Sequence, residues 1–278
     1  MEGKRFIYLD HAATTPARPE VVEAMLPYFT ESFGNPSSVY TFSQKNKAKI
    51  TECRELIAKT LGAKSNEIYF TAGGSESDNW ALKATAEAYA EKGKHIITTK
   101  IEHHAILHTA QYLESRGFEV TYLDVRNNHN ITAQQVKDAI REDTCLVTVM
   151  YANNEIGTIQ PIKEIGAVCR ENKVIFHTDA VQAVGHIKIN VKEQNIDMLS
   201  LSGHKFHGPK GVGALYVRRG LPLINVIEGG AQERGKRAGT ENIAGICGLA
   251  AALKDSCDHI DENMPKVAAL RDKLIDGL

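Results

Sequence analysis

Residues 94–123 read KHIITTKIEHHAILHTAQYLESRGFEVTYL and carry the pattern from which the fold follows. A β-branched run, Lys94–Lys100, precedes an amphipathic segment, Ala105–Arg116, and a second β-rich run, Phe118–Leu123, comes directly afterwards. Short β-branched runs favour strands, and apolar residues three to four positions apart favour a helix. The stretch therefore predicts a strand, a helix and a second strand, which is typical of a parallel β–α–β unit.

The same alternation extends to both sides of this stretch. Further strands are predicted at Glu67–Phe70, Cys145–Met150, Val174–His177 and Asp197–Leu201, and further helices at Ser75–Lys92, Thr132–Arg141, Pro161–Asn172 and Asn263–Leu278. Pro161 suits a first helical turn, and Thr132 with Gln135 resembles a capping box. Repeated alternation predicts a three-layer α/β fold, with a mostly parallel sheet between helices on both faces. In such folds ligands bind beyond the carboxyl ends of the strands.

Composition and charge exclude several classes of protein. The chain has 278 residues, is 42% hydrophobic and carries a net charge of −1, which fits an ordinary globular protein. A balanced charge offers no basic face for nucleic acid, and no apolar run approaches the length of a membrane helix. The five cysteines are scattered without CxxC spacing, so we expect neither a disulfide framework nor a structural zinc site. A cytoplasmic location follows as the default expectation.

A lysine follows the last predicted strand in the stretch Ser200–Lys210, SLSGHKFHGPK. Lys205 stands there among Ser202, His204 and several glycines. A lysine that forms a Schiff base needs a lowered pKa, which burial and neighbouring cations supply. The alternative at this point is an ordinary lysine on a surface turn.

Three more groups follow predicted strands. Gly74 and Ser75, in FTAGGSES, join a strand to a helix and form a candidate phosphate cradle, although a plain helix cap is the alternative. Asp179 is placed to keep a pyridine nitrogen protonated, or simply to cap a helix, and Gln182 is placed to donate to a ring oxygen. His103 is placed over an aromatic ring. An amine, a phosphate cradle, a carboxylate and an imidazole at one sheet edge match the requirements of pyridoxal 5′-phosphate (PLP).

Eight motifs resemble those of cysteine desulfurases of the NifS/IscS-like class, which are class-V aminotransferase relatives of fold type I. They are YLDHAATT, FGNPSS, TAGGSESDN, EHHAI, NNEIG, HTDAVQAVG, SGHKFHGPKG and QERGKRAGTEN, running from Tyr8 to Asn242. The resemblance implies a PLP enzyme that converts L-cysteine to L-alanine. The sulfur passes to a protein thiolate as a persulfide, for iron–sulfur cluster or thiocofactor assembly.

The resemblance also implies roles for individual residues. Lys205 holds the cofactor as a Schiff base and acts as the base at the substrate Cα, and His103 stacks on the ring and moves protons. Asp179 contacts the ring nitrogen, Gln182 the phenolic oxygen, and Asn154 lies near the ring oxygen and the substrate carboxylate. The residues expected around the phosphate are Gly74, Ser75, Ser202, His204 and, from the partner subunit of a homodimer, Thr240.

The resemblance further implies a domain organisation. Residues 1–15 are expected to belong to a small domain, residues 16–255 to form the PLP-binding large domain, and residues 256–278 to begin the rest of the small domain. The family's persulfide cysteine and its substrate-carboxylate arginine are expected beyond residue 278, so the C-terminal part is expected to be missing and this chain to be inactive in sulfur release. None of its cysteines stands in the matching motif, and Cys257 is the one expected to be most exposed.

Other functions remain open from the sequence. A related PLP lyase of the selenocysteine lyase type shares most of these motifs. A non-catalytic chain that dimerises with, or scaffolds, an intact enzyme is a second alternative. A metal site is a third, since His104 and His108 are four residues apart on one predicted helix, although no nearby ligand completes the set. A dinucleotide site is not expected, because no GxGxxG follows a strand.

Overall fold

The computed structural model describes residues 6–125 and 130–278. Residues 1–5, part of the predicted 1–15 segment, lie outside the described residues. The elements, in chain order, are α1 (Pro19–Met25), α2 (Pro27–Thr30), α3 (Thr41–Thr60), η1 (Ser65–Glu67), β1 (Ile68–Thr71), α4 (Gly74–Ala88), β2 (His95–Thr99), α5 (His104–Glu114), β3 (Glu119–Leu123), α6 (Ala133–Ala139), β4 (Thr144–Thr148), α7 (Ile162–Glu171), β5 (Ile175–Asp179), β6 (Met198–Ser202), η2 (Gly203–Lys205), β7 (Gly213–Val217), α8 (Gln232–Gly235), α9 (Ile243–Asp258) and α10 (Ile260–Asp276).

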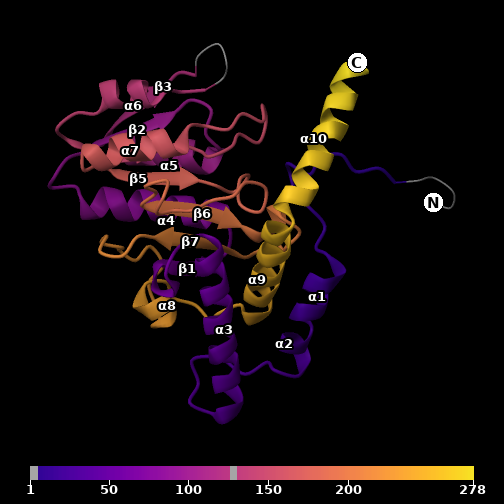
Figure 1. The fold of residues 1–278 in the computed structure, drawn as a ribbon. Coiled ribbons are helices and arrows are strands. Elements are labelled where there is room, and N and C mark those ends of the chain that lie inside the picture. Colours follow the sequence, from indigo (N-terminus) through magenta and orange to yellow (C-terminus); the bar gives the residue numbers. More distant parts are fainter. Residues whose placement is uncertain (1–5, 126–129) are drawn as a thin grey trace.

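Within the described residues, seven strands form one sheet in the order β1-β7-β6-β5-β4-β2-β3 (Figure 1). Strand β7 runs antiparallel to β1 and to β6, and the other neighbouring pairs are parallel. The predicted mostly parallel sheet is therefore confirmed. The central strands β2, β4, β5, β6 and β7 are buried at every position, as expected of a sheet covered on both faces.

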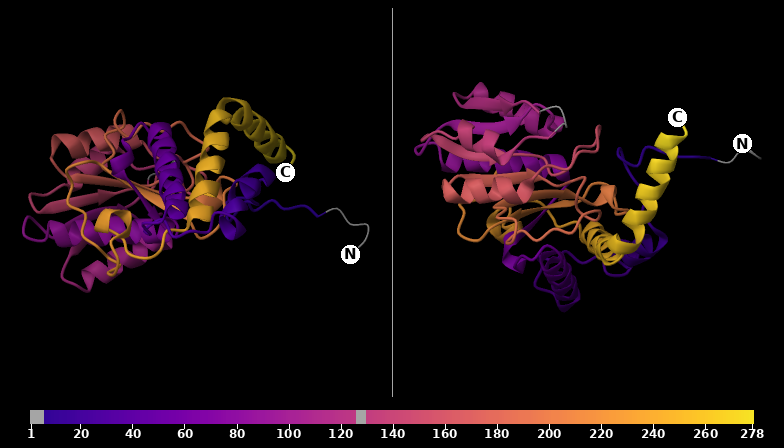
Figure 2. Two further views of the ribbon diagram at one scale, coloured as in Figure 1. Left: turned by 90° about the horizontal axis from the view of Figure 1, so that it is seen from below. Right: turned by 45° about the horizontal axis from the view of Figure 1, so that its top comes forward.

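Two hydrophobic clusters, one on each face of the sheet, make the three layers. Trp80 and Leu82 of α4 pack with Ile106 and Leu113 of α5 on one face. Helices α3, α6, α7 and α9 contribute to the cluster on the other face, and the two views of Figure 2 show helices on both faces of the sheet. The predicted three-layer α/β fold is confirmed. Among the described residues, no helix is long and apolar enough to span a bilayer.

Most predicted elements are present with bounds shifted by one to four residues, and three differences from the prediction stand out. Pro161 is the residue before α7 rather than part of its first turn, and its ψ of 66° is not helical. Strand β7 was not predicted, because the preceding stretch Gly203–Gly213 is rich in turn residues and hides the start of a short buried strand. The helix predicted at Asn263–Leu278 begins earlier, at Ile260, and continues to Asp276 as α10.

The capping box predicted at the start of α6 is present. The Thr132 hydroxyl accepts a hydrogen bond from the Gln135 backbone N–H at 3.1 Å, and the Gln135 side chain accepts from the Thr132 N–H at 3.0 Å. We expect Thr132→Ala to lower the free energy of unfolding by about 1 kcal/mol, since it leaves one helix N–H without its acceptor. Urea unfolding followed by circular dichroism measures the loss. Thr132→Ser keeps the hydroxyl and is the control; an equal loss in both variants would contradict the assignment.

Candidate active site

A cavity of about 520 Å³ opens at the carboxyl ends of the parallel strands, within the size range of small-molecule sites. Nine of the ten predicted site residues line it: Gly74, Ser75, His103, Asn154, Asp179, Gln182, Ser202, His204 and Lys205. The tenth, Thr240, is exposed and is not among the lining residues, so its predicted role in a partner's site stays a prediction. A larger hollow, about 680 Å³ beside α3 and α9, contains none of the ten.

Lys205 closes the short helical turn η2 directly after β6, which sets its side chain at the cavity. Its Nζ donates to the backbone carbonyls of Ala12 and Ala13, the second at 3.0 Å. Burial lowers the pKa of Lys205, while the negative charges of Asp179 and Asp10 raise it. A lysine held in this way is closer to the neutral amine that nucleophilic chemistry requires.

Asp179 ends β5 and is buried, with one carboxylate oxygen accepting from the Val181 N–H at 2.9 Å. The predicted local cap is thus present, and the residue also lines the cavity. A second carboxyl group, Asp78 of α4, lies beside it: ligand atoms of Asp78, Asp179 and His103 lie within 4.8 Å of one another. Burial raises the pKa of both carboxyl groups, and the charge of Asp179 raises that of Asp78 further.

The surroundings of Asp78 supply no cation. Its Oδ1 has no hydrogen-bond partner among the described residues, and the nearest imidazole nitrogen, His177 Nε2, is 3.7 Å away. Burial lowers the pKa of His177 to about 3, so that imidazole is neutral near pH 7. The charges of His103 and Lys205 lower the pKa of Asp179, whereas Asp78 has no such contribution, so the pair of adjacent buried carboxyl groups favours a ligand that brings a further positive charge. Asp78 was not predicted, although its position one turn after Ser75 on the same helix is a usable signal.

The loop between β1 and α4 forms the other end of the site. Gly73 has φ 149° and ψ −176°, a conformation open to glycine, and a Cβ on Gly74 would come within 2.6 Å of Val181 Cγ2. A second cavity of about 550 Å³ is lined by Gly73, Gly74, Ser75, Ser202 and His204. The N-terminus of α4 opens onto it, and free backbone N–H groups with a favourable dipole suit an anion there.

The remaining predicted residues make ordinary local contacts. His103 caps α5, and its Nδ1 accepts from the Ala105 N–H at 3.1 Å, so the neutral ring carries its proton on Nε2. The Gln182 side chain donates to the Ala12 carbonyl at 2.9 Å, and Asn154 donates to Glu155 Oε1 at 2.8 Å. The N-terminal segment around Ala12 therefore covers the cavity, a role that the sequence did not reveal.

Two other groups of residues bear on the alternatives. His104 and His108 do share a helix face and stack with ring centroids 5.1 Å apart. The cluster of three possible metal ligands found in the described part of the chain is Asp78, His103 and Asp179, so these two histidines lack a third ligand there. Cys257 is half-buried and the other four cysteines are buried; burial raises the pKa of Cys145 and of Cys257 to about 11.

Comparison with known proteins identifies the family. The family model described as "Aminotransferase class-V" matches residues 7–275. The chain belongs to this family, within its cysteine desulfurase branch. A curated relative, "Cysteine desulfurase IscS" of Clostridium botulinum, is 58% identical over 272 residues, which are 98% of this chain and 68% of the relative.

Two solved structures have a closely similar fold. One, titled "NIFS-LIKE PROTEIN", is 41% identical with a TM-score of 0.95, covering 98% of this chain and 75% of that one. Another, "SspA in complex with cysteine", is 48% identical with a TM-score of 0.88, covering 90% and 72%. The resemblance drawn from the motifs is confirmed, and with it the expectation of a PLP-dependent enzyme.

The cavity fits the cofactor of this class-V family. A protonated ring nitrogen would give Asp78 and Asp179 a further positive neighbour, and the glycine loop with the α4 N-terminus would receive the phosphate. Lys205 lies at the same cavity with its pKa lowered by burial. The donors and acceptors present are therefore those that PLP requires.

The buried acid Glu102, next to His103 in the chain, makes the stability of the fold depend on pH. Its Oε1 accepts from Thr99 Oγ1 at 2.8 Å and from the Met150 N–H at 2.9 Å, and burial raises its pKa from 4.5 to about 8. Because the folded-state pKa is the higher one, the stability that Glu102 contributes is full below pH 4.5 and is lost as the pH rises to 8.

We therefore expect Glu102→Gln to become more stable, relative to the parent, as the pH rises through this window. The difference should grow by up to about 1.4 kcal/mol per pH unit. Urea unfolding of both cofactor-free proteins between pH 5 and pH 9 measures it. A difference that stays constant with pH would show that Glu102 is ionised in the fold.

Proposed function

We propose that this chain binds PLP through Lys205 and removes sulfur from L-cysteine, leaving L-alanine, when an external thiol replaces the acceptor cysteine that the chain is expected to lack. The observation that carries the proposal is the placement of Lys205 and Asp179 at one cavity, with the glycine loop at its other end. The high identity to proteins named cysteine desulfurase supports the substrate, and so does the neighbour whose title includes bound cysteine.

Each residue of the site has a separate proposed role in the reaction. When bound, the cofactor supplies an electron sink for the carbanion formed at the substrate Cα. Lys205 takes the proton from Cα and returns one to the product. Asp179 keeps the ring nitrogen protonated, since a buried carboxylate beside it favours the charged form. Gly74, Ser75, Ser202 and His204 hold the phosphate, and His103 stacks on the ring.

The sulfur leaves Cβ for a thiol acceptor, R–SH, which becomes the persulfide R–S–SH while cysteine becomes alanine. An acceptor thiol has to be accessible and partly ionised. Burial raises the pKa of Cys145 and Cys257 to about 11, and Cys53, Cys169 and Cys247 are buried. The hydrogen bond with Cys53 lowers the pKa of Cys247, but its sulfur is not accessible to a substrate. We propose that the acceptor thiol is none of the five cysteines of this chain, and that the product serves iron–sulfur cluster or thiocofactor assembly in the cytoplasm.

A homodimer belongs to the same proposal. The segment from α2 to the start of α3 leaves large apolar side chains exposed: Phe29 by 61%, Phe33 by 67% and Tyr40 by 69%. Apolar groups gathered in this way are typical of a surface that another chain covers. We propose that a second copy covers them and receives Thr240 at its phosphate. Sedimentation equilibrium at micromolar concentration tests the stoichiometry, and a monomer would contradict this part.

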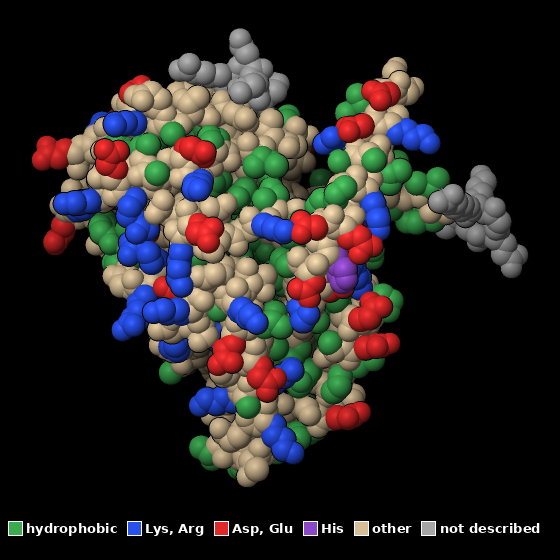
Figure 3. All heavy atoms as spheres, in the orientation of Figure 1, with side chains coloured by type: hydrophobic (Ala, Val, Ile, Leu, Met, Phe, Trp, Pro, Cys, Tyr) green, Lys and Arg blue, Asp and Glu red, His purple; other side chains and the backbone are tan. Residues whose placement is uncertain are grey.

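The proposed domain organisation assigns residues 1–15 and 256–278 to a small domain, separate from the large domain at 16–255. Helix α10 supports it, because it projects away from the sheet (Figures 1 and 2) and exposes Val267, Leu270 and Leu274 by 56%, 68% and 61%. Figure 3 shows hydrophobic side chains exposed along this helix. We propose that the rest of the small domain covers them.

The reaction is tested by incubating the purified protein with PLP, L-cysteine and dithiothreitol, which serves as the external acceptor. Formation of alanine and sulfide in equal amounts is the expected result. Alanine formed from selenocysteine but not from cysteine would favour the selenocysteine lyase type instead. Tight PLP binding without turnover of either amino acid would overturn the proposed activity and favour the non-catalytic scaffold.

A further inference from the structure

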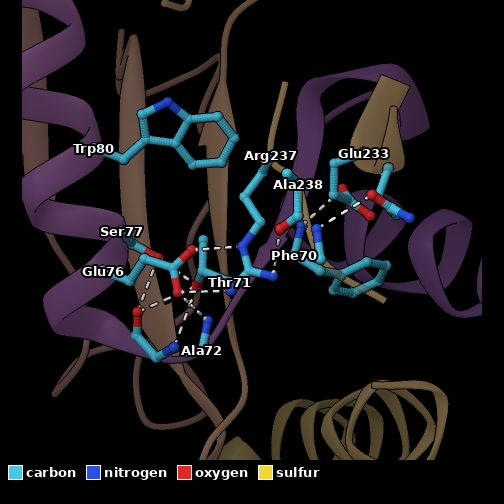
Figure 4. A network of polar contacts seen from close by, with 12 residues as sticks. Phe70, Thr71, Ala72, Glu76, Ser77, Trp80, Glu233, Arg237 and Ala238 are labelled. Carbon is cyan, nitrogen blue, oxygen red and sulfur yellow. Dashed lines mark hydrogen bonds and ion pairs between the residues drawn. The ribbon is translucent and has the colours of Figure 1, made fainter. Parts of the chain in front are cut away.

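A network of arginine–carboxylate pairs ties the segment Gln232–Thr240 to the loop between β1 and α4 (Figure 4). Arg237 reaches across to Glu76 with two hydrogen bonds, Nε to Oε1 at 2.8 Å and Nη2 to Oε2 at 3.0 Å. Both side chains are largely buried, with 21% and 17% exposed. A bidentate pair at these distances is among the stronger polar contacts in proteins.

Glu76 is also part of the phosphate end of the site. Its Oε2 accepts a further hydrogen bond from the Ala72 N–H at 2.8 Å, so the carboxylate fixes the loop backbone one residue before Gly73. Glu76 lines the 550 Å³ cavity together with Gly74, Ser75 and Ser202. A carboxylate therefore stands at the cavity where the proposed function places a phosphate dianion.

Without a positive partner, the Glu76 carboxylate would weaken binding of the phosphate by electrostatic repulsion. Two negative groups at one partly buried site repel each other, and low solvent exposure strengthens the repulsion. The guanidinium of Arg237 cancels the charge of Glu76 while leaving its hydrogen bond to Ala72 in place. The third side of that guanidinium is occupied as well, since Nη1 donates to the Ala238 carbonyl at 3.2 Å.

The backbone that carries Arg237 is itself fixed on β1. Glu233, buried and with φ 47°, accepts two hydrogen bonds from Arg54 at 2.7 Å and one from the Phe70 N–H at 2.9 Å. Arg234 donates to the Ile68 carbonyl at 2.9 Å and lies over the Tyr69 ring. The segment that carries Arg237 is therefore bound to β1 at Ile68 and at Phe70, which fixes the position of Arg237 beside Glu76.

We propose that Arg237 is a positioning residue for cofactor binding: it neutralises Glu76 and holds it on Ala72, so that the β1–α4 loop accepts the phosphate dianion. The proposal rests on the proposed function, because it presumes that PLP occupies the cavity. It deepens that function by assigning the charge balance of the phosphate end to two residues, neither of which was among the predicted site residues.

The test compares two ligands that differ by the phosphate. Apparent dissociation constants for PLP and for pyridoxal are measured by absorbance titration of the cofactor-free protein. We expect Arg237→Met to weaken PLP binding by at least about tenfold, the effect of roughly one unscreened charge contact, and to leave pyridoxal binding within about twofold. The double variant Glu76→Gln/Arg237→Met should recover PLP binding to within about threefold of the parent, since the amide keeps an acceptor for Ala72.

Arg141→Met is the matched control. Arg141 also pairs with two carboxylates, Glu119 and Asp143, but these lie at the amino ends of β3 and β4, away from the site. It should bind both ligands like the parent. Equal weakening of PLP and pyridoxal by Arg237→Met, or a double variant no better than the single one, would overturn the proposal by showing a merely structural role.

The same titration separates this inference from the proposed function. A parent protein that fails to bind PLP contradicts the proposed function itself. A parent that binds PLP while Arg237→Met binds it equally well contradicts the inference alone. Thermal unfolding of each cofactor-free variant confirms that the proteins compared are folded.

Discussion

The Lys205→Ala variant should lose desulfurase activity by about 10⁴-fold, the upper end of what a positioned general base contributes. Lys205 is the amine at the cavity, with its pKa lowered by burial and Asp179 lining the same space. Its removal takes away both the covalent anchor and the base at the substrate Cα. Alanine formation from L-cysteine at saturating PLP measures the loss.

The variant should nevertheless fold, because the Lys205 side chain contacts the backbone carbonyls of Ala12 and Ala13 rather than the core. Lys188→Ala is the control, since Lys188 pairs with Asp261 at the surface and lines no part of the active-site cavity. It should retain the activity of the parent. Activity of Lys205→Ala within about tenfold of the parent would contradict the assignment of the base, given the usual size of this effect.

The second large effect is expected from Asp179→Asn. The amide keeps the acceptor for the Val181 N–H, which now lies 2.9 Å from Oδ1, but it removes the charge that would face a ring nitrogen. We expect kcat to fall by about 10²–10³-fold, because about 3–4 kcal/mol of stabilisation of a charged state is lost. Cofactor affinity should change much less, since the phosphate end is untouched.

Steady-state kinetics and PLP titration of the same protein separate the two effects of Asp179→Asn. A fall in affinity as large as the fall in kcat would assign Asp179 to binding rather than to the electronics of the ring. Asp78→Asn is a useful companion, because Asp78 is buried next to Asp179 and its Oδ1 has no partner in the described structure. Its effect on kcat should be smaller than that of Asp179→Asn.

The fold was largely predictable because each strand of the parallel part is a short β-branched run between amphipathic segments. Strand order was not, since the pairing of β1 with β7 joins residues more than 140 positions apart. Periodicity reports which face of an element is buried and says nothing about its neighbour in the sheet. Strand β7 was not predicted because its five residues directly follow a glycine-rich turn, and no α-helix separates it from β6.

Nine of the ten predicted residues line one cavity. Lys205, Asp179 and His103 were predicted there because the carboxyl ends of parallel strands meet at one edge of the sheet. Asn154 and the phosphate roles of Ser202 and His204 came from the motif resemblance instead.

Three further residues at the site were not predicted, and none of them directly follows a strand. Asp78 and Glu76 project from a helix, and Ala12 comes from a segment that precedes every strand. The pairing of Glu76 with Arg237 depends on packing between residues 161 positions apart, which no local pattern reveals.

The central claim is that this cavity holds PLP on Lys205, and borohydride reduction tests it most directly. The purified protein is incubated with PLP, reduced, digested and mapped by mass spectrometry. A pyridoxyl group confined to the peptide that contains Lys205 is the predicted result. An unmodified Lys205 peptide, or pyridoxyl groups scattered over surface lysines such as Lys188, would contradict it.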